Sequence, residues 1–123
     1  MLTLPPEAET KLETEKNIWI ASVRPDGRPH LAPVWFVWYA GKIYIGTDAK
    51  SVKFHNIHRN RRVALALEDG THPLICEATA QLAALPLAEG LKAAFQQKYD
   101  WDITQEPQYN QVIEVTPEKW LNW

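Results

Sequence analysis

Short runs of β-forming residues, separated by tight-turn signals, constrain the fold of this chain more than any other feature. The strand-like runs lie at residues 17–23, 30–39, 43–45, 63–67, 74–82 and 111–116. Turn-forming residues at 25–27, 41–42 and 69–73 join successive runs, and Asp26-Gly27 supplies the positive backbone φ angles of hairpin turns. Such turns connect antiparallel strands, so the pattern predicts a mainly antiparallel sheet and argues against an alternating α/β fold.

Three segments carry helical signals instead: a short polar stretch at 6–16, residues 51–60, and an amphipathic repeat at 87–99. Five or six strands with short helices between them predict a small antiparallel barrel of mainly β (α+β) class. A chain of 123 residues is long enough for one core, so we expect a single domain spanning residues 1–123.

Composition and charge exclude several classes of protein. A formal net charge of −2 argues against nucleic-acid binding, which requires a broad basic face. No apolar run reaches the roughly 18 residues of a membrane-spanning helix. The first residues lack the basic and apolar regions of a signal peptide. We therefore expect no membrane partner and a cytoplasmic location. Cys76 is the only cysteine, which excludes an internal disulfide and a cysteine-built zinc site.

The stretch at 45–63 is the most informative one for function. Five cations occur there with no acid between them: Lys50, Lys53, Arg59, Arg61 and Arg62. Hydroxyls, a lysine and the free amides of a helix start together form a receptor for a small phosphate group, which makes Thr47, Ser51 and Lys53 candidate ligands of a phosphorylated cofactor. The alternative is a helix N-cap at Ser51 followed by solvated lysines, and spacing alone favours neither reading.

A second candidate is Pro33-Val34-Trp35, inside the strand-like run 30–39. Proline cannot donate a hydrogen bond to a β-ladder, so it marks an edge or a bulge, where neighbouring amides can face a ligand. The alternative, which is favoured without other observations, is a core strand with an edge proline.

Other kinds of chemistry have little support. His55 and His58 lie three residues apart on the predicted helix, but they lack cysteine or carboxylate partners at ligand spacing, so no metal site is expected. The sequence has no Gly-x-Ser-x-Gly motif, no His-Glu-x-x-His motif and no Walker loop, which argues against hydrolysis of esters, peptides or nucleotides. No catalytic residue can be assigned.

Six tryptophans are many for a small chain: such rings can fill a core, but a small domain has limited interior. Some are expected at a subunit interface or against a planar ligand. Trp120 and Trp123 lie at the carboxyl end, where too little chain follows to cover them. This aromatic excess predicts a homodimer.

The motifs follow one another in a specific order between about residues 17 and 82. They are Pro25-Asp26-Gly27, Pro33-Val34-Trp35-Phe36, Thr47, Ser51-x-Lys53-x-x-Asn56 and Arg62-Val63. This order and spacing strongly resembles the pyridoxamine 5′-phosphate oxidase-like split-barrel flavin-binding family. The combination carries the resemblance, since no single motif is diagnostic.

The resemblance implies a six-stranded antiparallel split β-barrel with short flanking helices. It also implies a homodimer that binds FMN, or in one branch a deazaflavin, at the subunit interface. By the same resemblance, the phosphate would be bound by Thr47, Ser51 and Lys53, and Asn56 would support the helix. The flavin ring would lie along Pro33, Val34 and Trp35.

The leading hypothesis is therefore an FMN-binding oxidoreductase that transfers a hydride or electrons through the flavin to a small-molecule substrate. This also explains why no acid–base pair stands out. One alternative is a deazaflavin-dependent reductase, whose longer anionic tail would suit Arg59, Arg61 and Arg62. The other is a non-catalytic flavin- or haem-binding protein for storage, electron relay or sensing.

Overall fold

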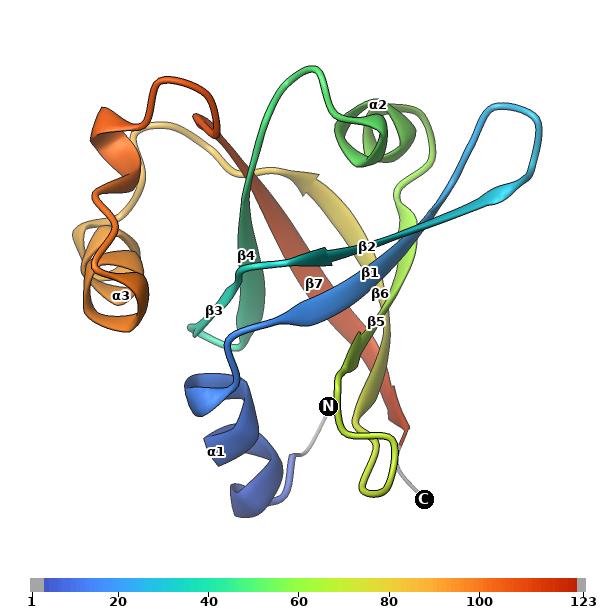
Figure 1. Cartoon of the computed structure of the whole chain (residues 1–123), viewed down its shortest axis with the longest axis horizontal. Coiled ribbons are helices and arrows are strands. Elements are labelled where there is room, and N and C mark those ends of the chain that lie inside the picture. The colour runs from blue at the N-terminus through green and yellow to red at the C-terminus, as the bar shows by residue number, and fades with distance from the viewer. Residues whose placement is uncertain (1–3, 122–123) are drawn as a thin grey trace.

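The computed structural model describes residues 4–121 and shows a mostly antiparallel sheet curled into a split barrel (Figure 1). The helices are α1 (Pro6–Thr14), α2 (Val52–Arg59), α3 (Glu89–Tyr99) and the short 3-10 helix η1 (Ile103–Gln105). The strands are β1 (Ile18–Val23), β2 (Pro29–Val34), β3 (Val37–Tyr39), β4 (Lys42–Thr47), β5 (Arg62–Leu67), β6 (Ile75–Leu82) and β7 (Gln111–Leu121). Their order in the sheet is β2-β1-β5-β6-β7-β4-β3. Within this part of the chain, no helix is both long and apolar enough to cross a membrane.

The sheet has seven strands where six were expected, because the run 30–39 is broken into β2 and β3. The backbone N–H of Phe36 donates to the hydroxyl of Tyr99 (2.9 Å), and the same hydroxyl lies within donating distance of the Phe36 carbonyl (2.8 Å). The Tyr99 hydroxyl also lies 2.8 Å from the Lys16 carbonyl, and its single proton serves one of these two carbonyls. The N–H of Phe36 is in either case bonded to a side chain and not to a neighbouring strand, so the ladder is interrupted there. The chain leaves one edge of the sheet as β2 and joins the opposite edge as β3, which is where the barrel is split.

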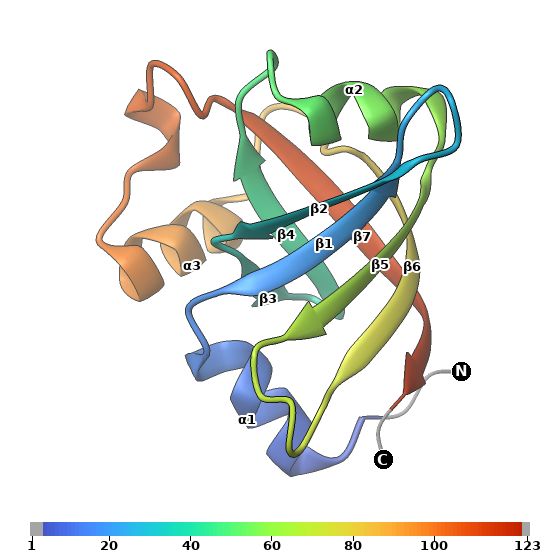
Figure 2. The same ribbon diagram turned by 45° about the vertical axis from the view of Figure 1, so that its right-hand side comes forward.

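The interior of the barrel is aliphatic. Alternate side chains along β1 and β4 point inward and are buried, among them Ile18, Ile20, Ile43 and Ile45. Figure 2 shows α1 at one end of the barrel and α2 at the other. Leu12 of α1 is fully buried in the same cluster, so this helix closes the lower end.

A smaller cluster lies on the opposite face of the sheet, under α3 (left in Figure 1). Leu91 and Phe95, one helical turn apart, pack with Tyr44 of β4, Val112 of β7 and Ile103 of η1. This packing follows from the amphipathic spacing of the helix. It holds the chain between α3 and β7 close to the ends of β2 and β4.

The last strand is longer than the sequence predicted, since β7 extends to Leu121. Its second half pairs with β6, with Trp120 opposite Cys76. Trp120 is half-buried and packs edge-on against Trp38, with ring centroids 5.9 Å apart. The expectation that Trp120 is left uncovered is therefore wrong, because strand pairing continues past residue 116. Trp123 lies outside the described residues.

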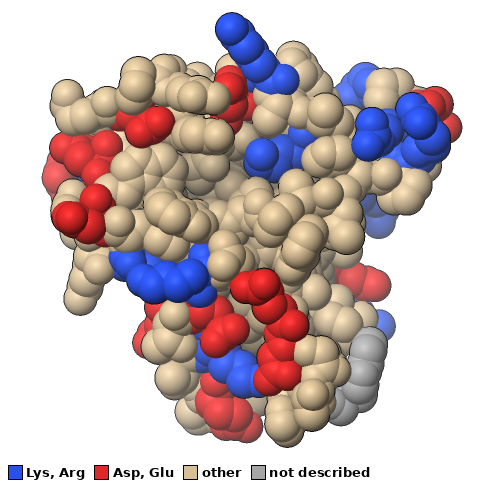
Figure 3. All heavy atoms as spheres, viewed as in Figure 1, with Lys and Arg blue, Asp and Glu red and all other residues tan. Residues whose placement is uncertain are grey.

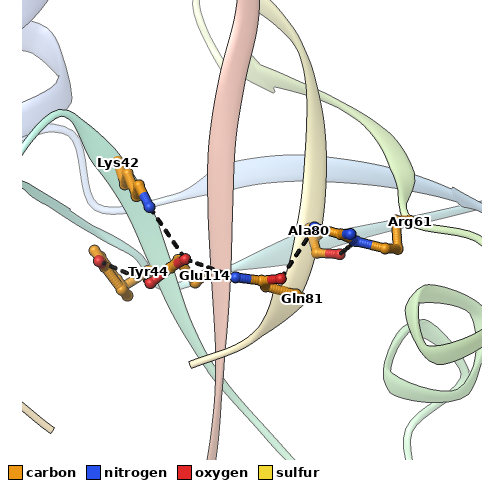
Figure 4. Close-up of polar contacts among 6 residues, drawn as sticks. All are labelled: Lys42, Tyr44, Arg61, Ala80, Gln81 and Glu114. Carbon is orange, nitrogen blue, oxygen red and sulfur yellow. Dashed lines mark hydrogen bonds and ion pairs between the residues drawn. The ribbon is translucent and has the colours of Figure 1, made fainter. Parts of the chain in front are cut away.

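The carboxylate of Glu114 in β7 accepts several hydrogen bonds on the outer face of the sheet (Figure 4). Its Oε1 accepts from Lys42 Nζ (3.2 Å) and Gln81 Nε2 (3.1 Å), and its Oε2 accepts from the Tyr44 hydroxyl (3.2 Å). The side-chain oxygen of Gln81 accepts in turn from Arg61 Nη2 (3.0 Å). Partial burial raises the pKa of Glu114, but the hydrogen bonds outweigh burial and lower the pKa below its ordinary value. The network ties β4 to β6 through β7 and orients the guanidinium of Arg61.

Candidate functional site

A cavity of about 440 Å³ opens where the end of β2, the start of α2 and the connection from α3 to β7 meet. Its lining is Pro33, Val34, Trp35, Gly46, Lys53, Trp101, Glu106 and Tyr109. Four of the residues predicted from the sequence are in this set: Pro33, Val34, Trp35 and Lys53. β2 is an edge strand, as Pro33 indicated, so its end is free to form a wall of the cavity.

The start of α2 is organised by two hydroxyl groups. Ser51 is the N-cap: its Oγ accepts from the backbone N–H of Phe54 at 3.2 Å. Thr47 Oγ1 lies 3.1 Å from Ser51 Oγ. Thr47 is fully buried, so it holds Ser51 in place and does not itself face the cavity. If Thr47 donates this bond, Ser51 keeps its own proton for an acceptor outside the helix.

Lys53 is the half-buried cation of the site. Of the described residues that line the cavity, Lys53 alone is positive and Glu106 alone is negative, and no ion pair joins them. Burial lowers the pKa of Lys53, and the carboxylate of Asp48 partly opposes this shift. A desolvated ammonium without a close partner gains free energy from an anion placed beside it.

Asn56 lies away from the cavity, on the side of α2 that packs on the sheet. It is buried, and its Nδ2 donates to Ser22 Oγ of β1 at 3.0 Å. This bond connects α2 to β1 and thereby fixes the height of the helix above the barrel. Asn56 is thus a positioning residue for the start of α2.

Aromatic rings line the cavity from the end of β2 and from the connection between α3 and β7. Trp35 stacks on Tyr99 with ring centroids 4.5 Å apart and an 8° angle between the planes. Trp101 meets Trp35 edge-on at 5.9 Å, and its indole N–H donates to Glu106 Oε2 at 3.2 Å. Trp35 is still 50% exposed, so one face of its ring is available to a ligand. Aromatic rings in such an arrangement are suited to holding a planar molecule.

Gly46 allows this wall to approach the strands. A Cβ atom at Gly46 would lie 2.5 Å from Cη2 of Trp101 and 3.0 Å from Cδ1 of Ile103. Any other residue would therefore push the indole ring away from β4. Close contact between Trp101 and β4 requires glycine at this position.

Sequence reasoning missed the wall residues Gly46, Trp101, Glu106 and Tyr109. The available signal was compositional: the excess of tryptophan predicted that some rings would face a planar ligand, without saying which ones. Trp101 follows α3 in a segment without regular structure, where no periodicity assigns its direction.

The structure separates the cations that the sequence places together. Lys53 faces the cavity at the start of α2, and Lys50 is exposed outside it. Arg59 at the other end of the helix, with Arg61 and Arg62 just after it, lines a different groove. Within residues 4–121, no cluster of three or more histidine, cysteine or acidic side chains is placed to hold a metal ion.

Sequence comparison identifies the family. Residues 4–123 match the family model described as pyridoxamine 5′-phosphate oxidase. The chain belongs to this family. The match confirms the family that the motifs between residues 17 and 82 indicated, and extends it over the last third of the chain. Among curated proteins, none matches the sequence significantly.

Solved structures have the same fold as this member of the family. The conserved hypothetical protein Rv2991 from Mycobacterium tuberculosis is 23% identical, with a TM-score of 0.81 over 100% of this chain and 86% of that chain. HutZ, a haem storage protein from Vibrio cholerae, is 19% identical, with a TM-score of 0.79 over 98% and 95% of the two chains. An F420 reductase is 24% identical, with a TM-score of 0.76 over 96% and 98%. At these identities the similarity shows the fold alone.

Proposed function

We propose that this chain binds FMN in the cavity beside α2 and acts as an oxidoreductase on a small-molecule substrate. The observation that carries the proposal is the juxtaposition of a single half-buried cation, Lys53, with a cavity walled by Trp35 and Trp101. A phosphate on an apolar, planar body has the chemistry that this pair of features complements. The cavity volume of about 440 Å³ is in the range of pockets that hold cofactors.

Bound FMN would supply the hydride and electron chemistry. The residues of the chain then have binding and orienting tasks. Lys53 and the hydroxyl of Ser51 hold the phosphate at the start of α2, and Thr47 and Asn56 keep that helix start in position. Pro33, Val34 and Trp35 lie along the ring, where the aromatic wall reduces its contact with water.

We also propose a homodimer with the cofactor at the subunit interface. The outer face of β1 and β5 carries Trp19, Ala21, Ala64 and Ala66, which are only partly buried, and Leu31 of the adjoining β2 is 61% exposed. This apolar face is continuous with the cavity, because Pro33 pairs with Trp19 and also lines the cavity. A second copy on this face would bury the apolar surface and border the cofactor.

Two other cofactors are the alternatives. The F420 reductase among the structural neighbours is named for a deazaflavin, and the same cavity would serve such a ring. HutZ is named a haem storage protein, which supports haem binding as a second candidate function. Among the described residues that line the cavity there is no histidine, cysteine or methionine, so Tyr109 is the one lining side chain of a type that ligates haem iron.

The visible absorption spectrum of the purified protein tests these alternatives. Flavin bands, with FMN identified by mass spectrometry after release, would support the proposal, whereas a Soret band or a released deazaflavin would contradict it. Turnover of the bound flavin under reducing conditions then separates an enzyme from a protein that only retains the cofactor. Light scattering at micromolar concentration tests the dimer: a monomer that keeps its cofactor would overturn that part.

A further inference from the structure

A second hollow of the molecule, separate from the cofactor cavity, is rich in arginine. It has a volume of about 710 Å³ and is lined by Arg24, Arg59, Arg61 and Arg62. Figure 3 shows basic side chains gathered at the upper right, where the β1–β2 hairpin and the end of α2 lie in Figure 1. The groove shares no lining residue with the cavity beside Lys53.

The arginines of the groove come from three separate segments. Arg24 lies in the β1–β2 hairpin, Arg59 ends α2, and Arg61 and Arg62 lead into β5. A cation at the end of a helix stabilises the helix dipole, which accounts for Arg59 alone. The other three lie beyond the helix, so helix stability does not explain why they converge.

Within the described residues, the groove arginines form no ion pair at salt-bridge distance. Glu118 is the single carboxylate on the groove, which leaves an excess of three positive charges in a chain whose net charge is −2. Like charges held together repel one another unless an anion lies between them.

Neutral donors complete the groove. The backbone N–H of Arg62 donates to Asn60 Oδ1, so the amide group of Asn60 keeps its two N–H donors free to point elsewhere. Thr79 of β6, directly opposite Arg62 in the ladder, adds a hydroxyl. The guanidinium of Arg61 is oriented by the Ala80 carbonyl (3.3 Å) and Gln81 Oε1 (3.0 Å), as Figure 4 shows.

We propose that this groove binds a small anion with consecutive phosphate groups, such as a pyrophosphate or triphosphate moiety. Guanidinium groups pair with phosphate oxygens in bidentate fashion, and guanidinium groups from three separate segments can engage more than one phosphate. The volume exceeds what one phosphate needs and is of ligand size.

Calorimetric titration of the full-length protein with inorganic tripolyphosphate tests the proposal. Arg62→Gln and Arg24→Gln are each expected to weaken binding about tenfold, since each removes a charge-assisted contact. Arg28→Gln is the matched control, because Arg28 lies on the same hairpin but outside the groove and is paired with Asp26 at 2.7 Å. Arg28 and Arg62 are exposed and Arg24 is partly exposed, so thermal unfolding should change little.

Several results would overturn this proposal. Equal losses in Arg28→Gln and Arg62→Gln would indicate general charge attraction, and orthophosphate binding as tightly as tripolyphosphate would exclude a site for consecutive phosphates. Tighter, arginine-dependent binding of a short single-stranded oligonucleotide would assign the groove to nucleic acid.

The groove is also expected to be independent of the cofactor cavity. Tripolyphosphate affinity should be unchanged by saturating FMN and in the Lys53→Ala variant, whereas competition between FMN and tripolyphosphate would mean that they share one site. The visible absorption spectrum tests FMN binding independently of this titration, so one proposal can fail without the other.

Discussion

The two sides of the cofactor cavity are held in place by different means. On the strand side, Pro33 and Gly46 belong to hydrogen-bonded strands, and Lys53 lies on a helix tied to β1. On the connection side, Trp101 lies in a segment without regular structure and is held by ring contacts and a hydrogen bond to Glu106. Backbone ladders fix the first side, whereas a few side chains fix the second.

This difference separates two tasks of a cofactor site. A phosphate requires a cation at a fixed position, which a rigid element provides, and a ring requires only a shaped apolar wall. A wall built from a connecting segment can change without altering the barrel. Tyr99 joins the two sides, because it ends α3 next to the connecting segment and contacts the strand side through the ring of Trp35 and the backbone of Phe36.

Lys53→Ala gives the sharpest test of the strand side. The variant loses a charge-assisted bond to the phosphate, worth roughly 1.5–3 kcal/mol, so FMN affinity should fall about ten- to a hundredfold. Lys50→Ala is the control and should cost much less, because Lys50 is exposed outside the cavity. Riboflavin, which lacks the phosphate, should barely distinguish Lys53→Ala from the parent. Equal FMN affinity in parent and variant, measured by fluorescence titration, would place the phosphate elsewhere.

Tyr99→Phe tests the link between the sides. The substitution keeps the ring but leaves the N–H of Phe36 and one of two nearby carbonyls, of Phe36 or Lys16, without the hydroxyl. This loss should lower the free energy of unfolding by about 1–3 kcal/mol. Chemical denaturation measures the change. Tyr109→Phe, at an exposed ring of the same cavity, should be nearly neutral. A comparable loss in both variants would contradict the role of the Tyr99 hydroxyl.

Trp101→Leu tests the connection side. Losing the aromatic wall should weaken FMN and riboflavin alike, by about two- to tenfold, because ring contacts of this kind are worth roughly 0.5–1.5 kcal/mol. Trp120→Leu is the control, since Trp120 packs against Trp38 away from the cavity. If Trp101→Leu weakened FMN but not riboflavin, the two sides would not divide the tasks as described.

The smallest expected effect is a pH dependence of stability that comes from Lys98 of α3. Burial, and next the neighbouring Lys16, lower its pKa from 10.5 to about 8, with Glu15 opposing. The unfolded chain therefore binds more protons between these values, and stability should rise with pH through that window. In the parent, the free energy of unfolding should rise by on the order of 1 kcal/mol across this window, after allowance for partial exposure, and Lys98→Met should remove that rise.

Thermal unfolding of parent and variant between pH 7 and 10.5 measures the difference. Lys119→Met, at an exposed position, controls for the loss of one lysine. A constant difference in stability between parent and Lys98→Met across this range would contradict the shifted pKa.

The strand side was largely predictable from the sequence, because its signals are local. Proline at 33 marks an edge, and a serine at 51 before a helical run marks an N-cap, whatever the rest of the chain does. The break at Phe36 was not predictable, since it depends on Tyr99, 63 residues away. The same holds for Trp101, whose position depends on the space left by Gly46 on another strand.

The central position of β7 has a consequence for how the protein is made. β7 lies between β6 and β4, although it follows every other strand in the sequence. During synthesis, the hairpin of β3 and β4 has no sheet to join until residues 111–121 have left the ribosome. Until then both it and β6 expose unpaired edges, which are sites for pairing with other chains. Completion of the barrel is thus a late step with long-range contacts, which we expect to be slow.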